Sequence, residues 1–353
     1  MYCRECGAEI PQGAKFCTSC GLPVGGRAPR PPQPEEYREG PPAPCDDLLP
    51  SRVAPTRNSR TPHASVEPTR RKRRPARVTI CLVMLCLGLV FIFEIVGYLV
   101  SAIPGMPLGQ EVLVTFAGAA GACVSVVILG GRKLLSCRGD TIVLALKKGW
   151  WVLATSLGLT VYGVVASVLE NETVVEDGWP LRLLEVLVLC IGIGVFEEAC
   201  FRGLIFGSLL DAGGKSRKGL YIVTIFASLL FGMAHIDWFG MDYADPLSIL
   251  QAVLKTVQTG LFGFFLCALV MRSKSVWGAA LLHALSDFII MIPGMVLLNG
   301  PMDVSYVSKG EEAIAVIVLY IVFIVCYIPL AIIGRSMLSK QPLPDFGPFH
   351  KER

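Results

Sequence analysis

Charged residues are scarce in this chain. They make up 17% of its 353 residues, whereas 53% are hydrophobic and the mean hydropathy is +0.58. A soluble domain carries about 25% charged residues, so the composition excludes an ordinary soluble enzyme. The abundance of apolar residues also excludes a wholly disordered or collagen-like chain.

Basic residues are concentrated at one end of the chain. Residues 1–77 hold 14 Lys and Arg against 8 Asp and Glu, whereas the rest of the chain holds 18 against 20. A nucleic-acid-binding protein needs its basic residues on a folded face. Nothing in this distribution predicts such a face, so we expect no nucleic-acid partner.

Two Cys-x-x-Cys pairs lie within residues 1–21. Four thiolates in two close pairs suit a tetrahedral zinc ion, and the glycine after each pair allows a sharp turn. Disulfides or a redox pair are the alternatives, but no signal-peptide pattern precedes the cysteines and no βαβ pattern surrounds them. The predicted zinc ligands are Cys3, Cys6, Cys17 and Cys20. Because all four positions are cysteine, this zinc is structural. The stretch resembles the zinc-ribbon module found at the ends of many microbial membrane proteins.

Residues 22–77 have the composition of a linker. They contain 13 prolines in 56 residues and almost no apolar periodicity, which predicts a Pro/Arg-rich disordered segment. The segment ends in the basic cluster Arg70 to Arg74, just before the first long apolar run. A nuclear-localisation or nucleic-acid role is one interpretation of this cluster. Cations that flank a membrane span are the better one, because they orient the span and bind anionic headgroups.

Long apolar runs begin at residue 78, and eight of them are long enough to cross about 30 Å of hydrocarbon. They lie near 78–103, 111–130, 149–169, 182–207, 219–236, 248–271, 276–298 and 312–334. The first is too long and starts too late for a signal peptide. We therefore predict an all-α polytopic membrane protein of about eight transmembrane helices over 78–336, followed by a tail over 337–353.

The loops between these runs alternate in charge. Loops rich in Lys and Arg alternate with loops that contain neither residue and carry several acids. The positive-inside rule predicts this alternation for a protein whose N- and C-termini are both cytoplasmic. We therefore expect an integral membrane protein that is surrounded by the lipid bilayer. Its zinc ribbon is expected in the cytoplasm, the reducing compartment.

Several ionisable residues fall inside the predicted spans. A charged side chain at the bilayer centre costs at least ~2.5–3.5 kcal/mol, so it requires a partner. Glu185 and Lys255 lie near predicted span ends, where long side chains reach the interface. Glu94 is an isolated carboxyl. The remaining residues form three groups.

The first group lies in the run 182–207. Glu198 and Arg202 are four residues apart, so they share one helical face and can pair. Glu197 points about 100° away from that face, and the same arginine neutralises it less easily. This arrangement leaves Glu197 free to act as a general base.

The other two groups contain histidines. Phe231 and His235 are four residues apart in one run, and His283 and Asp287 are four apart in another, where the aspartate can fix the orientation and tautomer of the imidazole. The chain has only four histidines, and the two others lie in its tails. A structural hydrogen-bond network, worth about 1–2 kcal/mol per bond at most, explains one such group. Three groups on three helices favour function.

The three motifs together resemble a known family. Glu-Glu-x-x-x-Arg, Phe-x-x-x-His and His-x-x-x-Asp, in this order on three membrane helices, resemble the CPBP family over roughly residues 140–300. Its members are intramembrane proteases related to the CAAX prenyl endopeptidases and to bacteriocin-processing proteins. The last family position is Asn or Asp. Here it is Asp287, which is a poorer neutral hydrogen-bond donor than Asn.

The resemblance implies an intramembrane endopeptidase that hydrolyses a membrane-associated or lipidated substrate. Glu197 or Glu198, together with His235, would activate a water molecule. His283 and Asp287 would face the developing oxyanion. As an alternative, the two histidines and one glutamate would bind a catalytic zinc ion, since two His, one Glu and a water form an established protease site.

Arg202 would hold its glutamate in place. At 1.5 Å per residue from the predicted cytoplasmic helix ends, the predicted depths are ~12 Å for His283, ~15–20 Å for Glu197 and ~20–25 Å for His235. These residues meet only if helices tilt or the predicted boundaries shift by a turn.

Non-proteolytic functions compete with the protease hypothesis. Buried acids, bases and a guanidinium also form proton relays in transporters, although no internal repeat of the transporter kind is present. A scaffold or immunity-type membrane protein would use the same network structurally. The zinc ribbon is expected to bind a partner protein or to regulate access.

Overall fold

The structure is a computed structural model that describes residues 107–169, 175, 178–298, 306–310, 312–343 and 348–349. The chain divides into two units, 1–68 and 69–353, and all of the described residues belong to the second. The predicted zinc ribbon, linker and first span, together with Glu94, lie outside the described residues.

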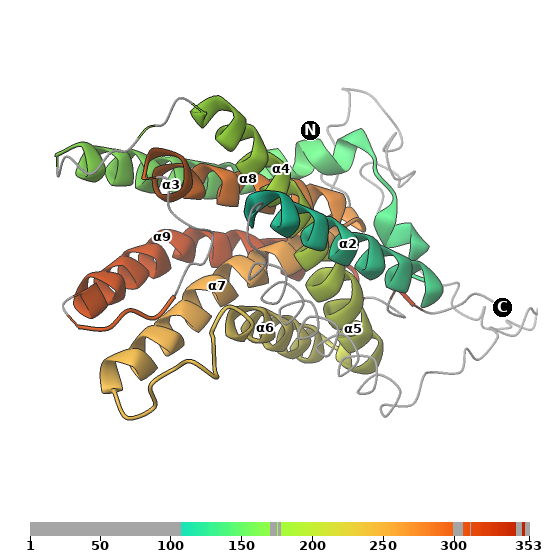
Figure 1. Ribbon diagram of the computed structural model, residues 1–353. Coiled ribbons are helices and arrows are strands. Elements are labelled where there is room, and N and C mark those ends of the chain that lie inside the picture. The colour runs from blue at the N-terminus through green and yellow to red at the C-terminus, as the bar shows by residue number, and fades with distance from the viewer. Residues whose placement is uncertain are drawn as a thin grey trace, which may run out of the picture. The chain divides into compact units, whose positions relative to one another are not determined.

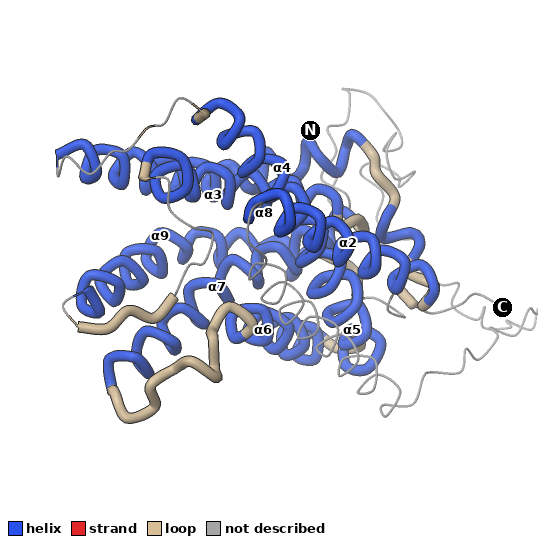
Figure 2. Tube along the Cα trace, viewed as in Figure 1, coloured by secondary structure: helices blue, strands red, loops and turns tan. Residues whose placement is uncertain are grey.

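The described elements are all helical, and no strand is present among them (Figures 1 and 2). In chain order they are α2 (Pro107–Ile128), η1 (Arg132–Leu135), α3 (Gly139–Leu169), α4 (Trp179–Glu197), η2 (Glu198–Phe206), α5 (Gly207–Gly213), α6 (Arg217–Met233), α7 (Pro246–Ser273), α8 (Trp277–Met291), η3 (Ile292–Leu297) and α9 (Glu312–Lys340). η1 is a 3₁₀-helix, and η2 and η3 are π-helices.

The long helices pack in two groups. In one group α8 lies between α3 and α4, and α4 also packs against α2. In the other group α7 lies between α6 and α9 (Figure 1). The π-helix η2 contacts helices of both groups. Residues on η2 are therefore placed where the two groups meet.

Small residues and polar contacts join the helices, as is usual in membrane bundles. Gly194 of α4 lies so close to α8 that a Cβ atom at this position would come within 2.6 Å of the Ala280 carbonyl oxygen. The hydroxyls of Ser156 on α3 and Ser286 on α8 lie 2.9 Å apart. These contacts hold α8 tightly between its two neighbours.

A conventional N-cap begins α7. The carboxylate of Asp245 accepts hydrogen bonds from the Ser248 hydroxyl at 2.8 Å and from the Leu247 amide at 3.0 Å. These bonds lower the pKa of Asp245 below its ordinary value. The cap satisfies amides that the first turn leaves without partners.

The outer surface of the bundle is apolar. Leu113, Leu157 and Ile332 each expose more than half of their surface, which suits contact with lipid. Five described helices are long and apolar enough to cross a membrane, namely α2, α3, α7, α8 with η3, and α9. The all-α polytopic membrane fold predicted from the sequence is confirmed. The predicted number of eight transmembrane helices is approximate.

Candidate active site

The three predicted groups meet at one place in the bundle. Glu197, Glu198 and Arg202 come from the junction of α4 and η2, His235 from the turn after α6, and His283 and Asp287 from α8. The nearest pairs of nitrogen and oxygen atoms among them are 2.7–3.9 Å apart. The structure thus brings all six residues together, although their predicted depths differed.

The helix that carries the first group changes its winding at the site. α4 is α-helical up to Glu197, η2 is a π-helix over the next nine residues, and α5 continues as an α-helix. All nine residues of η2 are buried. π-helical segments are rare and occur frequently at functional sites.

Glu198 is the buried centre of the cluster. Its Oε1 atom lies 2.7 Å from Nη1 of Arg202 and 2.9 Å from Nδ1 of His283, and the glutamate side chain is fully buried. The predicted pairing of Glu198 with Arg202 is therefore present. Because an ionised carboxylate can only accept a hydrogen bond, the hydrogen on Nδ1 of His283 points toward Glu198.

The partner that orients His283 differs from the one expected. The sequence suggested Asp287, one turn further along α8. Instead, Asp287 faces the other ring nitrogen, with Oδ2 3.4 Å from Nε2, while Glu198 takes the hydrogen bond of Nδ1. The cause is the burial of Glu198 directly beside the ring, which spacing within α8 could not indicate.

Glu197 lies between the two imidazoles. Its Oε2 atom is 3.9 Å from Nε2 of His235 and 3.8 Å from Nε2 of His283, and 21% of its side chain is exposed. Neither distance is short enough for a direct hydrogen bond. Within the described part of the chain this oxygen has no hydrogen-bond partner. Glu197 is thus the less constrained and more accessible of the two glutamates.

His235 is oriented by the backbone of α6. It lies two residues beyond the end of the helix, and its Nδ1 atom is 2.9 Å from the carbonyl oxygen of Phe231. A carbonyl only accepts, so Nδ1 donates to it. Nε2 of the neutral ring is then an acceptor, and it faces Glu197.

Phe231 forms an aromatic wall behind the cluster. The guanidinium carbon of Arg202 lies 3.9 Å from the centre of this ring. The rings of His235 and His283 pack edge-on against it, with centroids 4.8 Å and 5.8 Å away. One buried phenyl ring therefore contacts a residue from each of the three groups, which explains the Phe-x-x-x-His spacing.

Two residues that the sequence did not assign to the site lie beside it. Lys255 was expected to reach the interface from a span end. Its ammonium group instead lies 3.9 Å from the ring centre of Tyr306. The Tyr306 ring is in turn 5.9 Å from the His235 ring. The position of Lys255, nine residues inside α7, was a usable sequence signal, whereas Tyr306 offered none.

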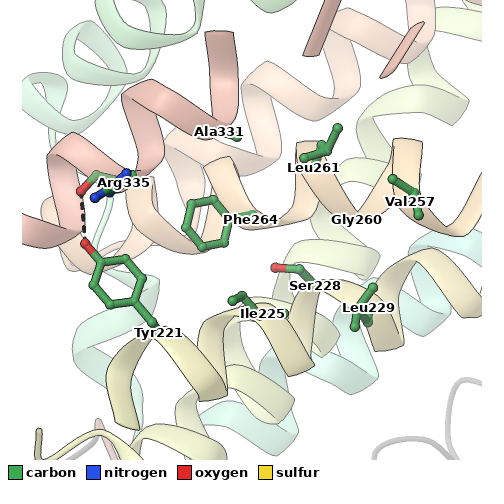
Figure 3. Close-up of a pocket in the computed structure, with 10 residues that line it drawn as sticks. All are labelled: Tyr221, Ile225, Ser228, Leu229, Val257, Gly260, Leu261, Phe264, Ala331 and Arg335. Carbon is green, nitrogen blue, oxygen red and sulfur yellow. Dashed lines mark hydrogen bonds between the residues drawn. The ribbon is translucent and has the colours of Figure 1, made fainter. Parts of the chain in front are cut away.

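A separate apolar groove lies beside α6. It has a volume of about 560 Å³ and is formed by α6, α7 and α9 (Figure 3). Tyr221 and Arg335 lie at one end of it, where the tyrosine hydroxyl donates a hydrogen bond of 3.4 Å to the Arg335 carbonyl oxygen. None of the six candidate residues lines the groove.

The alternative expected from the sequence is a zinc site made of the two histidines and one glutamate. In the described ranges no group of three His, Cys, Asp or Glu side chains is positioned to hold a metal ion. The catalytic zinc site considered as an alternative is therefore not seen in the described part of the chain.

Family comparisons agree with the site. Residues 179–289 match the family model described as type II CAAX prenyl endopeptidase Rce1-like. This segment lies within the second unit. The matched segment contains all six candidate residues. Residues 2–24 match the zinc-ribbon domain. Both resemblances predicted from the sequence are thus confirmed, while neither the curated proteins nor the solved structures give a significant match.

The zinc-ribbon match contains all four predicted cysteine ligands, a donor set that suits structural zinc. We expect one zinc ion per full-length chain and none in a variant that carries Cys3→Ser and Cys6→Ser together. The helical bundle should keep its helical content in that variant. Metal analysis of the purified proteins measures this. Zinc retained at one per chain in the variant would contradict the assignment and point to a site in the membrane domain.

Proposed function

We propose that this protein is an intramembrane endopeptidase that hydrolyses a peptide bond in a membrane-associated or lipidated substrate. The Rce1-like domain supports protease activity in general. The observation that carries the specific proposal is that one oxygen of Glu197 lies within 3.9 Å of a ring nitrogen of both His235 and His283, which come from two other segments. Acid and base groups arranged in this way can bind and activate one water molecule.

In the proposed mechanism, Glu197 and His235 act on the water. The separation of 3.9 Å between their facing atoms suits a shared water better than a direct contact. The water oxygen attacks the carbonyl carbon of the substrate while its proton passes to Glu197 or to Nε2 of His235. When the C–N bond breaks, that proton goes to the leaving amine. The products are a new carboxylate end and a new amine end.

The other residues hold and polarise the reacting groups. Arg202 fixes Glu198, and Glu198 orients His283 through its hydrogen bond. Because Nδ1 of His283 already donates to Glu198, a second hydrogen on Nε2 requires the doubly protonated ring. That hydrogen would point to the carbonyl oxygen as it becomes an oxyanion, with Asp287 beside it. One such donor is worth about 10²–10³-fold in rate. No step of this mechanism uses a metal ion.

The surroundings of the site suit a substrate held in the bilayer. The site lies within a bundle whose outer surface is apolar, and the groove beside α6 can hold an apolar chain. The charge alternation of the loops supports an orientation with both termini in the cytoplasm. A lipidated peptide, a small hydrophobic peptide or another membrane protein all fit these surroundings.

The proposal is tested with the full-length protein in liposomes that contain lipid-anchored peptides. Mass spectrometry should detect both cleavage products, and His235→Ala should lower the rate by about 10²–10⁴-fold. His63→Ala, which changes one of the two tail histidines, is the matched control and should leave the rate unchanged. Equal processing by Glu197→Gln, Glu198→Gln, His235→Ala and the parent protein would remove the enzyme hypothesis. It would leave a transporter or scaffold function.

A further inference from the structure

Lys255 is a half-buried cation at the edge of the site. Its ammonium nitrogen lies 3.9 Å from the ring centre of Tyr306 and 5.8 Å from that of Tyr320. Among the described residues no carboxylate lies within 4.0 Å of this nitrogen. Aromatic faces attract a cation but do not neutralise it. Within the described part of the chain the charge therefore has favourable surroundings but no ion-pair partner.

The aromatic faces around Lys255 are held in place independently of it. Gln251, one turn earlier on α7, donates to the carbonyl oxygen of Ser308 and accepts from its amide, both at 2.9 Å. The Tyr320 hydroxyl donates to the carbonyl oxygen of Tyr306 at 2.6 Å. The short segment 306–310 is thus tied to α7 and α9. Lys255 therefore lies against aromatic rings that other contacts hold in place, and it does not extend to the membrane interface.

Lys255 belongs electrostatically to the candidate active site. Through-space interactions connect its charge with Glu197, Asp287 and His235. The Tyr306 ring that it contacts is the neighbour of the His235 ring. Lys255 is therefore linked to the cluster through the Tyr306 ring, which neighbours His235.

We infer that Lys255 is a specificity residue that binds a carboxylate of the peptide substrate. A peptide can present this group as its free C-terminus or as an acidic side chain, and an ammonium group in partly desolvated surroundings binds either through charge-assisted hydrogen bonds. The inference rests on the proposed function, because it places a peptide beside Glu197 and His235. It predicts that substrate charge near the cleaved bond governs affinity.

Three lipid-anchored fluorescent peptides test the inference. They share one sequence without internal acids and end in a free acid, in an amide, or in an amide with one glutamate added near the end. Binding is measured by fluorescence anisotropy on full-length protein that carries Glu197→Gln, so that no cleavage interferes. The free acid should bind about ten-fold or more tightly than the plain amide. Tight binding of the glutamate peptide alone would assign the carboxylate to a side chain instead.

Substitutions identify the residue responsible. Lys255→Met should bind acid and amide alike, whereas Lys255→Arg should keep the preference and so control for misfolding. Lys309→Met, which removes an exposed lysine of the segment 306–310, should also keep it. The inference would be overturned if Lys255→Met weakened the binding of all three peptides equally. It would also be overturned if the protein with Lys255 intact bound all three peptides with equal affinity. Cleavage measured with Glu197 restored separates the two proposals: a carboxylate preference without cleavage rejects only the protease, and cleavage without a preference rejects only this site.

Discussion

Replacing Glu197 with glutamine should abolish peptide-bond hydrolysis and leave the helical bundle folded. Glutamine has the same size but cannot accept a proton from water. The oxygen that faces the two imidazoles has no hydrogen-bond partner among the described residues, and the side chain is 21% exposed. The substitution therefore breaks no buried pair. Loss of a general base typically lowers the rate by about 10²–10⁴-fold, and cleavage of a lipid-anchored peptide in liposomes measures it.

A matched control lies on the same helix. Glu185→Gln makes the same chemical change three turns earlier on α4, outside the cluster, and should leave the rate unchanged. Thermal unfolding in detergent should give similar midpoints for the parent and both variants. If Glu197→Gln cleaved at the parent rate while remaining folded, Glu197 would not be the base. In that case hydrolysis should be lost in His235→Ala but not in Glu197→Gln.

The sequence predicted the spans and the three polar groups because hydrophobic length and four-residue spacing are local properties. It placed the start of one helix ten residues too late, at 149 instead of Gly139. The apolar run begins only after Lys147 and Lys148, whereas the helix already includes both lysines. Charge limits a membrane span, but it does not end a helix. His235 was placed within a span, yet it lies in the turn after α6.

Contacts between helices were harder to predict. Nothing in the spacing within α8 indicates that Glu198, 85 residues away, orients His283. The π-helix η2 has no pattern of its own, since the pair Glu198–Arg202 keeps the four-residue spacing of an α-helix. The contact of Lys255 with Tyr306 depends on how a segment after α8 returns to α7. Such contacts follow from packing, which a single sequence reports only indirectly.

Replacing Arg202 with methionine should destabilise the protein by about 3–5 kcal/mol, the typical cost of leaving one partner of a buried ion pair without the other. Arg202 and Glu198 are 1% and 0% exposed, and their closest atoms are 2.7 Å apart. Among the described residues, the variant leaves the carboxylate of Glu198 with the imidazole of His283 as its one polar partner. Reversible unfolding in detergent measures the free energy, and hydrolysis should fall as well because the orientation of His283 depends on Glu198.

The surface of the same protein offers a control with nearly the same geometry. Arg138 and Asp140 form an ion pair at 2.8 Å, but their side chains are 62% and 67% exposed. Arg138→Met should therefore leave the unfolding free energy nearly unchanged, because solvent screens an exposed ion pair. Adding Glu198→Gln to Arg202→Met removes the uncompensated charge and should restore much of the stability. It should not restore activity, since a glutamine no longer holds His283 as a carboxylate does. If Arg202→Met lowered the unfolding free energy no more than Arg138→Met does, the buried ion pair would not stabilise the cluster. Another group would then have to orient the ring of His283.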